Sequence, residues 1–322
     1  MKTIKQQIMK SDKPEMREDI AEYINTHSSE FLQLVASVFD TAGKEDLKKQ
    51  IIGICDLLDR QLMCEAIGRA VNDQSSDVRV LGLRAVYRTR SEEFTADCLK
   101  LVRDENEPFE VRKWATHILA SEHPNEYGRV LRQIARDTGE NMELRREAVH
   151  ALTKIDDDKT VGSLCAILGD SSEDMRKSAA WALGRIADEE SIDCLLAALE
   201  DESEAVRDWS VRALRDMGAP KAVQGLIDAM KEAPPEEQVR MIRLIVEKRS
   251  EIILRSIAEF LSSPHTEVRR VAAWAMGVSP YPPAAASLEH LLDDEDARVR
   301  KYAEEALRRL GRIDGSEFES MF

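Results

Sequence analysis

Six histidines carry the side chains best suited to hold a metal ion or to transfer a proton at neutral pH. They are His27, His117, His123, His150, His265 and His290. They are spread along the chain, and their acidic neighbours precede them, in the steps Glu122-His123 and Glu289-His290. A metal site needs several ligands that converge on one ion, and this spacing brings no such group together. The sequence therefore predicts no metal site and no cofactor.

Five cysteines are the candidate nucleophiles or disulfide partners: Cys55, Cys64, Cys98, Cys165 and Cys194. Their number is odd and no C-x-x-C pair occurs, so we expect small core or boundary residues in a reducing compartment. The chain also lacks a glycine-rich phosphate loop and a G-x-S-x-G motif. These absences predict a protein without a catalytic site.

A basic residue recurs along the chain at nearly constant spacing, and we call it the marker. The markers are Arg17, Lys48, Arg79, Arg112, Arg145, Arg176, Arg207, Arg240, Arg269 and Arg300. Successive markers are 29 to 33 residues apart. A period of this length indicates an array of stacked helical units.

The segment from Asp170 to Asp201 shows one unit in full. Apolar residues at helical spacing predict a first helix over about residues 173–187, which carries the marker. A second helix is expected from Ile192 to just before Asp201, after a short polar turn. Neither helix can bury its apolar side alone, so the unit requires neighbours.

Small and large residues repeat in step with the marker. The third residue after it is small in seven units: Gly82, Ala115, Ala148, Ala179, Ser210, Ala272 and Ala303. Small side chains let helices approach closely. We expect the marker arginines to pair with aspartates between the repeats as a structural ladder, formed by Arg79, Arg112, Arg145, Arg176, Arg207, Arg269 and Arg300.

The pattern Asp-x-x-x-x-Val-Arg-x-x-Ala-x-x-Ala-Leu-Gly-x-Ile, carried by Asp170–Ile186 and echoed from Asp201 and Asp294, resembles HEAT repeats. More narrowly, it resembles the short type named after phycobilisome lyase subunits. The resemblance implies an all-α solenoid, a right-handed superhelix of about ten helical hairpins. Deoxyhypusine hydroxylase is similar to this architecture and carries paired His-Glu motifs, whereas no His-Glu dipeptide occurs here.

The predicted domain organisation is a polar N-terminal extension at residues 1–13, one solenoid at 14–312 and an acidic tail at 313–322. The composition, 43% hydrophobic with 33% charged and 5% aromatic residues, suits this arrangement. No run is long and apolar enough to span a bilayer, and the first residues lack the apolar core of a signal peptide. We therefore expect a cytoplasmic protein that binds no membrane.

Surface charge is the remaining guide to function, since the chain is acidic with a net charge of −15. The second helices are expected to line the concave side. Their outward positions are basic toward the N-terminus, at Arg69, Lys100, Arg103, Arg129 and Arg136. Toward the C-terminus they are acidic, at Asp193, Glu200, Asp228, Glu259 and Asp293. Trp181 and Trp274 are expected on the convex side as further partner anchors.

These features predict a non-enzymatic scaffold or adaptor that binds another protein, for example a basic segment in the acidic half of the groove. One alternative is an accessory subunit of a bilin-lyase-type enzyme. Another is nucleic-acid binding through the basic half, although the net charge makes nucleic acid an unfavoured partner.

Overall fold

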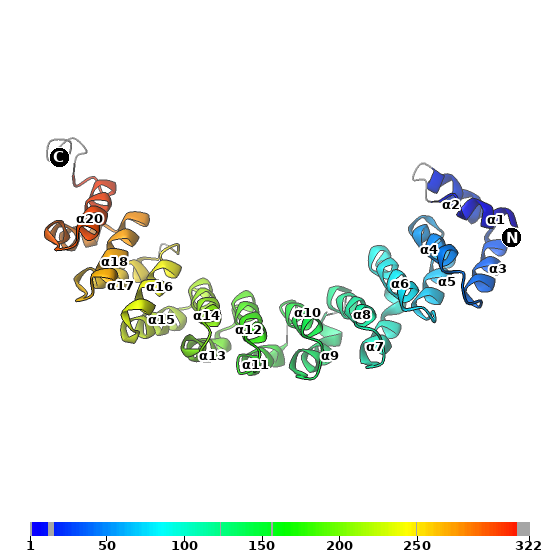
Figure 1. The fold of residues 1–322 in the computed structure, drawn as a ribbon, viewed down its shortest axis with the longest axis horizontal. Coiled ribbons are helices and arrows are strands. Elements are labelled where there is room, and N and C mark those ends of the chain that lie inside the picture. The colour runs from blue at the N-terminus through cyan, green and yellow to red at the C-terminus, as the bar shows by residue number, and fades with distance from the viewer. Residues whose placement is uncertain (1, 12–15, 123, 156, 249, 314–322) are drawn as a thin grey trace. The chain divides into compact units, whose positions relative to one another are not determined.

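The computed structural model describes residues 2–11, 16–122, 124–155, 157–248 and 250–313, and its regular elements there are all helical (Figure 1). The chain divides into two compact units, Met1–Thr160 and Val161–Phe322. Paired helices repeat through each unit, which confirms the predicted all-α solenoid. Among the described residues, every helix is too short or too polar to cross a bilayer.

Unit 1 contains five first helices, each of which carries its marker. They are α2 (Arg17–Thr26), α4 (Glu45–Gly53), α6 (Ser76–Thr89), α8 (Phe109–Glu122) and α10 (Met142–Leu152). Its second helices are α3 (Ser28–Phe39), α5 (Arg60–Val71), α7 (Thr95–Arg103) and α9 (Pro124–Arg136). An additional helix, α1 (Lys2–Ile8), lies within the predicted N-terminal extension and buries Ile4 and Ile8 completely. Part of that extension therefore belongs to the packed structure.

Unit 2 repeats the same alternation. Its first helices are α12 (Glu173–Ile186), α14 (Glu204–Met217), α16 (Pro235–Ile245), α18 (Thr266–Val278) and α20 (Ala297–Arg309). Its second helices are α13 (Ile192–Ala197), α15 (Pro220–Glu232), α17 (Glu251–Glu259) and α19 (Ala285–His290), and α11 (Asp158–Ile167) begins just before the unit boundary. Short 3₁₀ turns extend α13 to Glu200 and α19 to Asp293. Residues 314–322, most of the predicted acidic tail, lie outside the described part.

The two kinds of helix form separate rows within each unit. In Figure 1 the first helices α12 to α20 lie on the inner side of the bend of unit 2, and α2 to α10 do so in unit 1. The prediction that the second helices line the concave side is therefore wrong for each unit taken by itself. The sequence period gives the buried side of each helix, but it does not give the direction in which successive pairs tilt.

Close approach of first helices explains the small residues. Contacts join α6 to α8, α12 to α14 and α18 to α20, and Ala179, Ala272 and Ala303 are fully buried there. Gly82 is the tightest case, because a Cβ at this position would lie 2.8 Å from the backbone nitrogen of Val71. Only glycine leaves room for α5 and α6 to pack at this point.

The marker arginines link successive repeats through hydrogen bonds. Arg176 Nε and Nη2 donate to the Asp201 carboxylate at 2.8 and 3.0 Å, and its Nη1 donates to the Asp170 carbonyl at 3.0 Å. Arg269 makes the equivalent bonds to Asp294 and to the Ser263 carbonyl. Each guanidinium thus joins the turn before its own helix to the turn of the next repeat.

The ladder is less uniform than a row of Arg–Asp pairs. Arg79, Arg112 and Arg207 pair with glutamates instead, namely Glu107, Glu140 and Glu237. Arg145 is 2% exposed and donates to the Ala135 carbonyl, and Arg300 donates to the Asp294 carbonyl. The shared element is the marker side chain at the turn, whereas its acidic partner varies.

Arg176→Ala should lower the free energy of unfolding of unit 2 by about 3 kcal/mol, because the Asp201 carboxylate would remain largely buried without its cation. The adjacent Lys177→Ala, which removes only a half-exposed pair with Asp174, should cost less than about 0.5 kcal/mol. Urea unfolding followed by circular dichroism measures both. Equal losses in the two variants would show that the ladder does not stabilise the stack.

Asp294 gives the ladder a pH dependence. The Arg269 hydrogen bonds, against the opposing effect of burial, lower the pKa of Asp294 below its usual value. A carboxylate with a lowered folded pKa contributes stability above its unfolded pKa of about 3.9, and this is lost as pH falls through the folded pKa. Asp294→Asn should therefore lose less stability than the parent between pH 5 and pH 2 in urea unfolding. An unchanged pH dependence would contradict this assignment.

Candidate functional site

The described histidines do not gather into one site. His27 stacks on Tyr23, with ring centroids 4.2 Å apart. His117 Nδ1 lies 2.7 Å from Glu147 Oε1, and this hydrogen bond lowers the pKa of the Glu147 carboxyl. Within the described ranges, no three His, Cys, Asp or Glu side chains are placed to hold a metal ion, and His123 lies outside those ranges.

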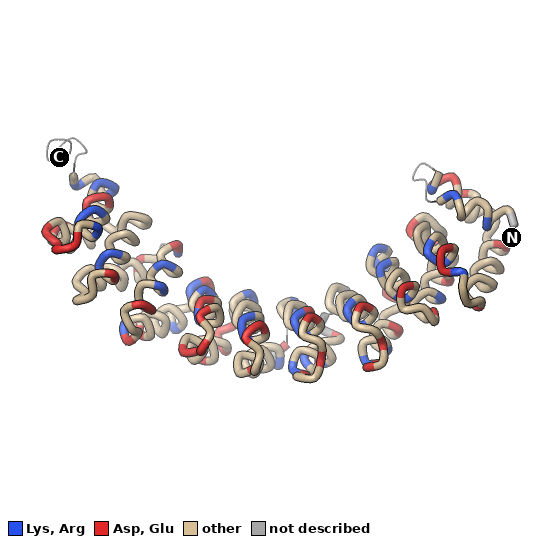
Figure 2. The backbone as a smooth tube through the Cα atoms, in the orientation of Figure 1, with Lys and Arg blue, Asp and Glu red and all other residues tan. Residues whose placement is uncertain are grey.

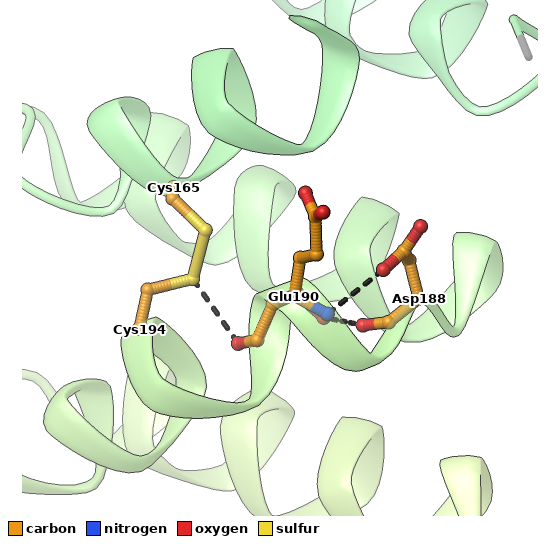
Figure 3. The surroundings of a disulfide bond; sticks show 5 residues. Cys165, Asp188, Glu190 and Cys194 are labelled. Atoms are coloured by element: carbon orange, nitrogen blue, oxygen red, sulfur yellow. Dashed lines mark hydrogen bonds between the residues drawn. A yellow bond between two sulfur atoms is a disulfide. The ribbon is translucent and has the colours of Figure 1, made fainter. Parts of the chain in front are cut away.

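Two of the five cysteines form a disulfide. Cys165 on α11 is bonded to Cys194 on α13, 29 residues further along the chain, whereas Cys55, Cys64 and Cys98 are free (Figure 3). The expectation that all five are reduced thiols is therefore wrong, and the cysteines no longer argue for a reducing compartment. The sequence signal was present but weak: the two residues lie on neighbouring second helices and are 29 residues apart, close to the local marker spacing of 31 residues.

The predicted basic residues lie on the second helices of unit 1. Lys100, Arg103, Arg129 and Arg136 are exposed on α7 and α9, and the described residues offer them no ion-pair partner within 4.0 Å. Arg69 on α5 differs, because it pairs with both Asp40 and Glu65. A hollow of about 540 Å³ beside Arg103 has the Arg112–Glu140 pair in its wall. The free basic charge is thus concentrated on α7 and α9.

The predicted acidic residues lie on the second helices of unit 2 and their 3₁₀ extensions. Asp193, Glu200, Asp228, Glu259 and Asp293 are all exposed. Two of them are partly neutralised, since Asp193 pairs with Lys221 at 2.8 Å and Glu259 pairs with Lys231 at 2.6 Å. The acidic charge is therefore weaker than the sequence alone suggested.

The second helices of unit 1 and unit 2 still differ in the sign of their net charge when all charged residues of these helices are counted. Helices α3, α5, α7 and α9 together carry seven Lys or Arg and four Asp or Glu. Helices α13, α15, α17 and α19 carry three Lys or Arg and six Asp or Glu. Figure 2 shows both signs on the first and second helices, so the separation is a bias and not a division into pure charges.

The two tryptophans predicted as convex anchors lie on first helices, as their distance from the markers requires, but this row is not on the convex side. Trp181 belongs to α12 and Trp274 to α18, the row on the inner side of the bend of unit 2, and both are half-buried. Trp274 borders a hollow of about 410 Å³ between α16, α18 and α20. Sequence reasoning singled out this residue but missed the hollow, because its walls come from three different repeats.

Unit 1 has a related hollow of about 350 Å³ that involves α4, α6 and α8. Its lining includes Lys49, Arg84, Arg88 and Trp114. The Arg84 guanidinium lies 5.0 Å from the Trp114 ring centroid, within cation–π distance. The chain's own arginine thus occupies the indole face at this site.

The family follows from the repeat sequence. The model for HEAT repeats matches residues 109–182, 128–215, 161–241 and 223–308, which together cover more than half of the chain. The chain belongs to the HEAT-repeat family, as its marker pattern predicted. No curated protein sequence is significantly similar to it.

Several solved structures are similar to this chain. A chain in the structure of Kap95p bound to RanGDP has a TM-score of 0.54 at 11% identity, and the match covers 96% of this chain and 49% of that one. An engineered protein has a TM-score of 0.45 at 17% identity, covering 97% and 99%. The phycocyanin lyase complex of CpcE and CpcF from Nostoc sp. PCC7120 has a TM-score of 0.38 at 18% identity, covering 70% and 92%. At 11% identity the match to the Kap95p structure shows the fold alone.

Reduction of the Cys165–Cys194 disulfide should lower the free energy of unfolding by about 3 kcal/mol, because the bond closes a loop in the unfolded chain. Mass spectrometry after alkylation of the unfolded, unreduced chain should find three modified cysteines, and five after reduction. A Cys165→Ala/Cys194→Ala chain is the control, since reductant should not change its stability. Five modified cysteines before reduction would contradict the disulfide.

Proposed function

We propose that this HEAT-repeat chain is a non-enzymatic scaffold or adaptor that holds another protein. The opposite charge bias of the second helices in the two units supports this role most directly. Opposed charge blocks orient a partner and speed its association more than they raise its affinity. Each unit would therefore select a segment of a different charge.

The acidic second helices of unit 2 are the proposed site for a basic segment of the partner. Glu200 and Asp228 are exposed on successive repeats and have no ion pair among the described residues. Their carboxylates are therefore available to lysine or arginine side chains. Trp181 and Trp274 would add apolar anchors on the first-helix side.

We also propose that the protein acts in the cytoplasm. A strongly reducing compartment would reduce the Cys165–Cys194 disulfide. The number of free thiols in protein isolated from its own cells therefore tests the proposed location.

Nucleic acid is a second candidate partner, for unit 1 alone. Lys100, Arg103, Arg129 and Arg136 are exposed and without ion pairs in the described part, as phosphate contacts require. A single-stranded oligonucleotide should then give a band shift that weakens steeply with salt. No shift at low ionic strength would remove this candidate.

Charge reversal tests the protein-binding role. A fluorescent peptide of alternating lysine and alanine should bind the full chain, and Glu200→Lys/Asp228→Lys should weaken it about tenfold, because each surface ion pair contributes up to about 1 kcal/mol. The control Glu173→Lys/Glu204→Lys makes the same change in net charge at exposed first-helix positions. Fluorescence anisotropy at two salt concentrations measures the affinities. Equal weakening by both variants would show attraction by net charge alone and reject the proposed surface.

A further inference from the structure

The hollow between α16, α18 and α20 combines positive charge with aromatic surface. Its lining consists of Arg243, Arg270, Val271, Trp274, Arg298 and Tyr302, and its volume is about 410 Å³. Val271 is 3% exposed, whereas Trp274 and Tyr302 are half-buried. This volume lies within the range of pockets that take one large side chain or a small ligand.

Two of the three arginines are not neutralised by the chain. Arg243 and Arg298 are exposed, and neither guanidinium has an acidic partner within 4.0 Å among the described residues. Arg270 pairs with Glu267 on its own helix. Three guanidiniums beside one hollow repel each other, so a bound carboxylate is stabilised there by charge and by hydrogen bonds.

The aromatic surface is also left open, unlike that of other tryptophans on first helices. The Trp114 ring is covered by Arg84, and the Trp209 ring has the Arg212 guanidinium 5.7 Å from its centroid. Trp274 makes no ring stacking or cation–π contact with any described residue. An incoming aromatic or aliphatic side chain can therefore pack on its indole.

We infer that this hollow binds an acidic peptide segment of a partner protein, with one aromatic side chain placed against Trp274 and flanking carboxylates on Arg243 and Arg298. The inference rests on the proposed role as a binding protein, but it concerns the first-helix face and a partner of opposite charge. Arginine clusters are a common means of recognising acidic motifs.

Single-stranded nucleic acid is the competing occupant, and the surroundings disfavour it. A nucleic-acid strand needs a basic track that follows its backbone over several nucleotides. On α16, Arg240 stands three residues before Arg243 and is held by Asp208 and Glu237. On α14, Arg215 is held by Asp216. A basic hollow beside arginines that are already paired suits a short anchor better than a continuous polyanion.

The test uses the full chain and a fluorescent nonapeptide with a central phenylalanine, flanked on each side by alternating glutamate and aspartate. Anisotropy should report binding, and Arg243→Ala/Arg298→Ala should weaken it at least tenfold. Lys301→Ala/Arg255→Ala is the matched control, because both residues are exposed cations of unit 2 outside the hollow, and it should change affinity less than twofold. Trp274→Ala should also weaken binding tenfold, and Trp274→Phe should restore most of it.

Three results would overturn the inference: equal affinity for a peptide with alanine in place of phenylalanine, equal loss in the control variant, or tighter binding of a thymidine decamer at the same site. Because Trp274→Ala could unfold α18, its helix content is checked by circular dichroism. If it is unfolded, Arg243→Ala/Arg298→Ala alone tests the inference, because both arginines are exposed. Glu200→Lys/Asp228→Lys should leave acidic-peptide binding intact. A loss of basic-peptide binding can therefore be distinguished from a loss of acidic-peptide binding at this hollow.

Discussion

Burial of each helical pair by the next pair is the interaction on which the structure depends. A pair of short helices has apolar residues that it cannot cover by itself, such as Ala179 and Leu183 on α12, which are fully buried where α14 packs against them. Marker arginines then fix how neighbours align, because Arg176 and Arg269 each bond to their own preceding turn and to the turn of the next repeat. Stability is thus built from interactions between nearest neighbours.

This dependence explains why so much of the fold could be predicted from the sequence. Marker spacing and the small residues after it are direct consequences of packing, as Gly82 shows where any Cβ would meet the backbone of α5. The acidic partners of the markers were harder to predict, because either an aspartate or a glutamate in the turn can reach the guanidinium, as Asp201 and Glu140 do. The Cys165–Cys194 bond and the packing of α1 through Ile4 and Ile8 were missed, since each depends on contacts between elements and not on a local pattern.

The candidate surfaces were less predictable for a related reason. Packing fixes the buried side of a helix, but it leaves the exposed sides of both rows free to carry any charge. Reading Asp193 and Glu259 as free acidic charge was incomplete because Lys221 and Lys231 lie within reach on neighbouring second helices. Which row lies on the inner side of a bend depends on small tilts between successive pairs, and these are properties of the assembled unit.

Tryptophan rings on the first helices differ in whether an arginine of the chain covers them. Five residues after the marker stand Arg84 and Arg212, which cover Trp114 and Trp209, each two residues after a marker. In the repeat of Arg269 the position five residues after the marker is Trp274 itself. In this repeat the position that carries a covering arginine elsewhere carries an indole. Trp274 thus stands where an arginine covers a ring in two other repeats, and it lies beside Arg243 and Arg298, which have no ion pair among the described residues.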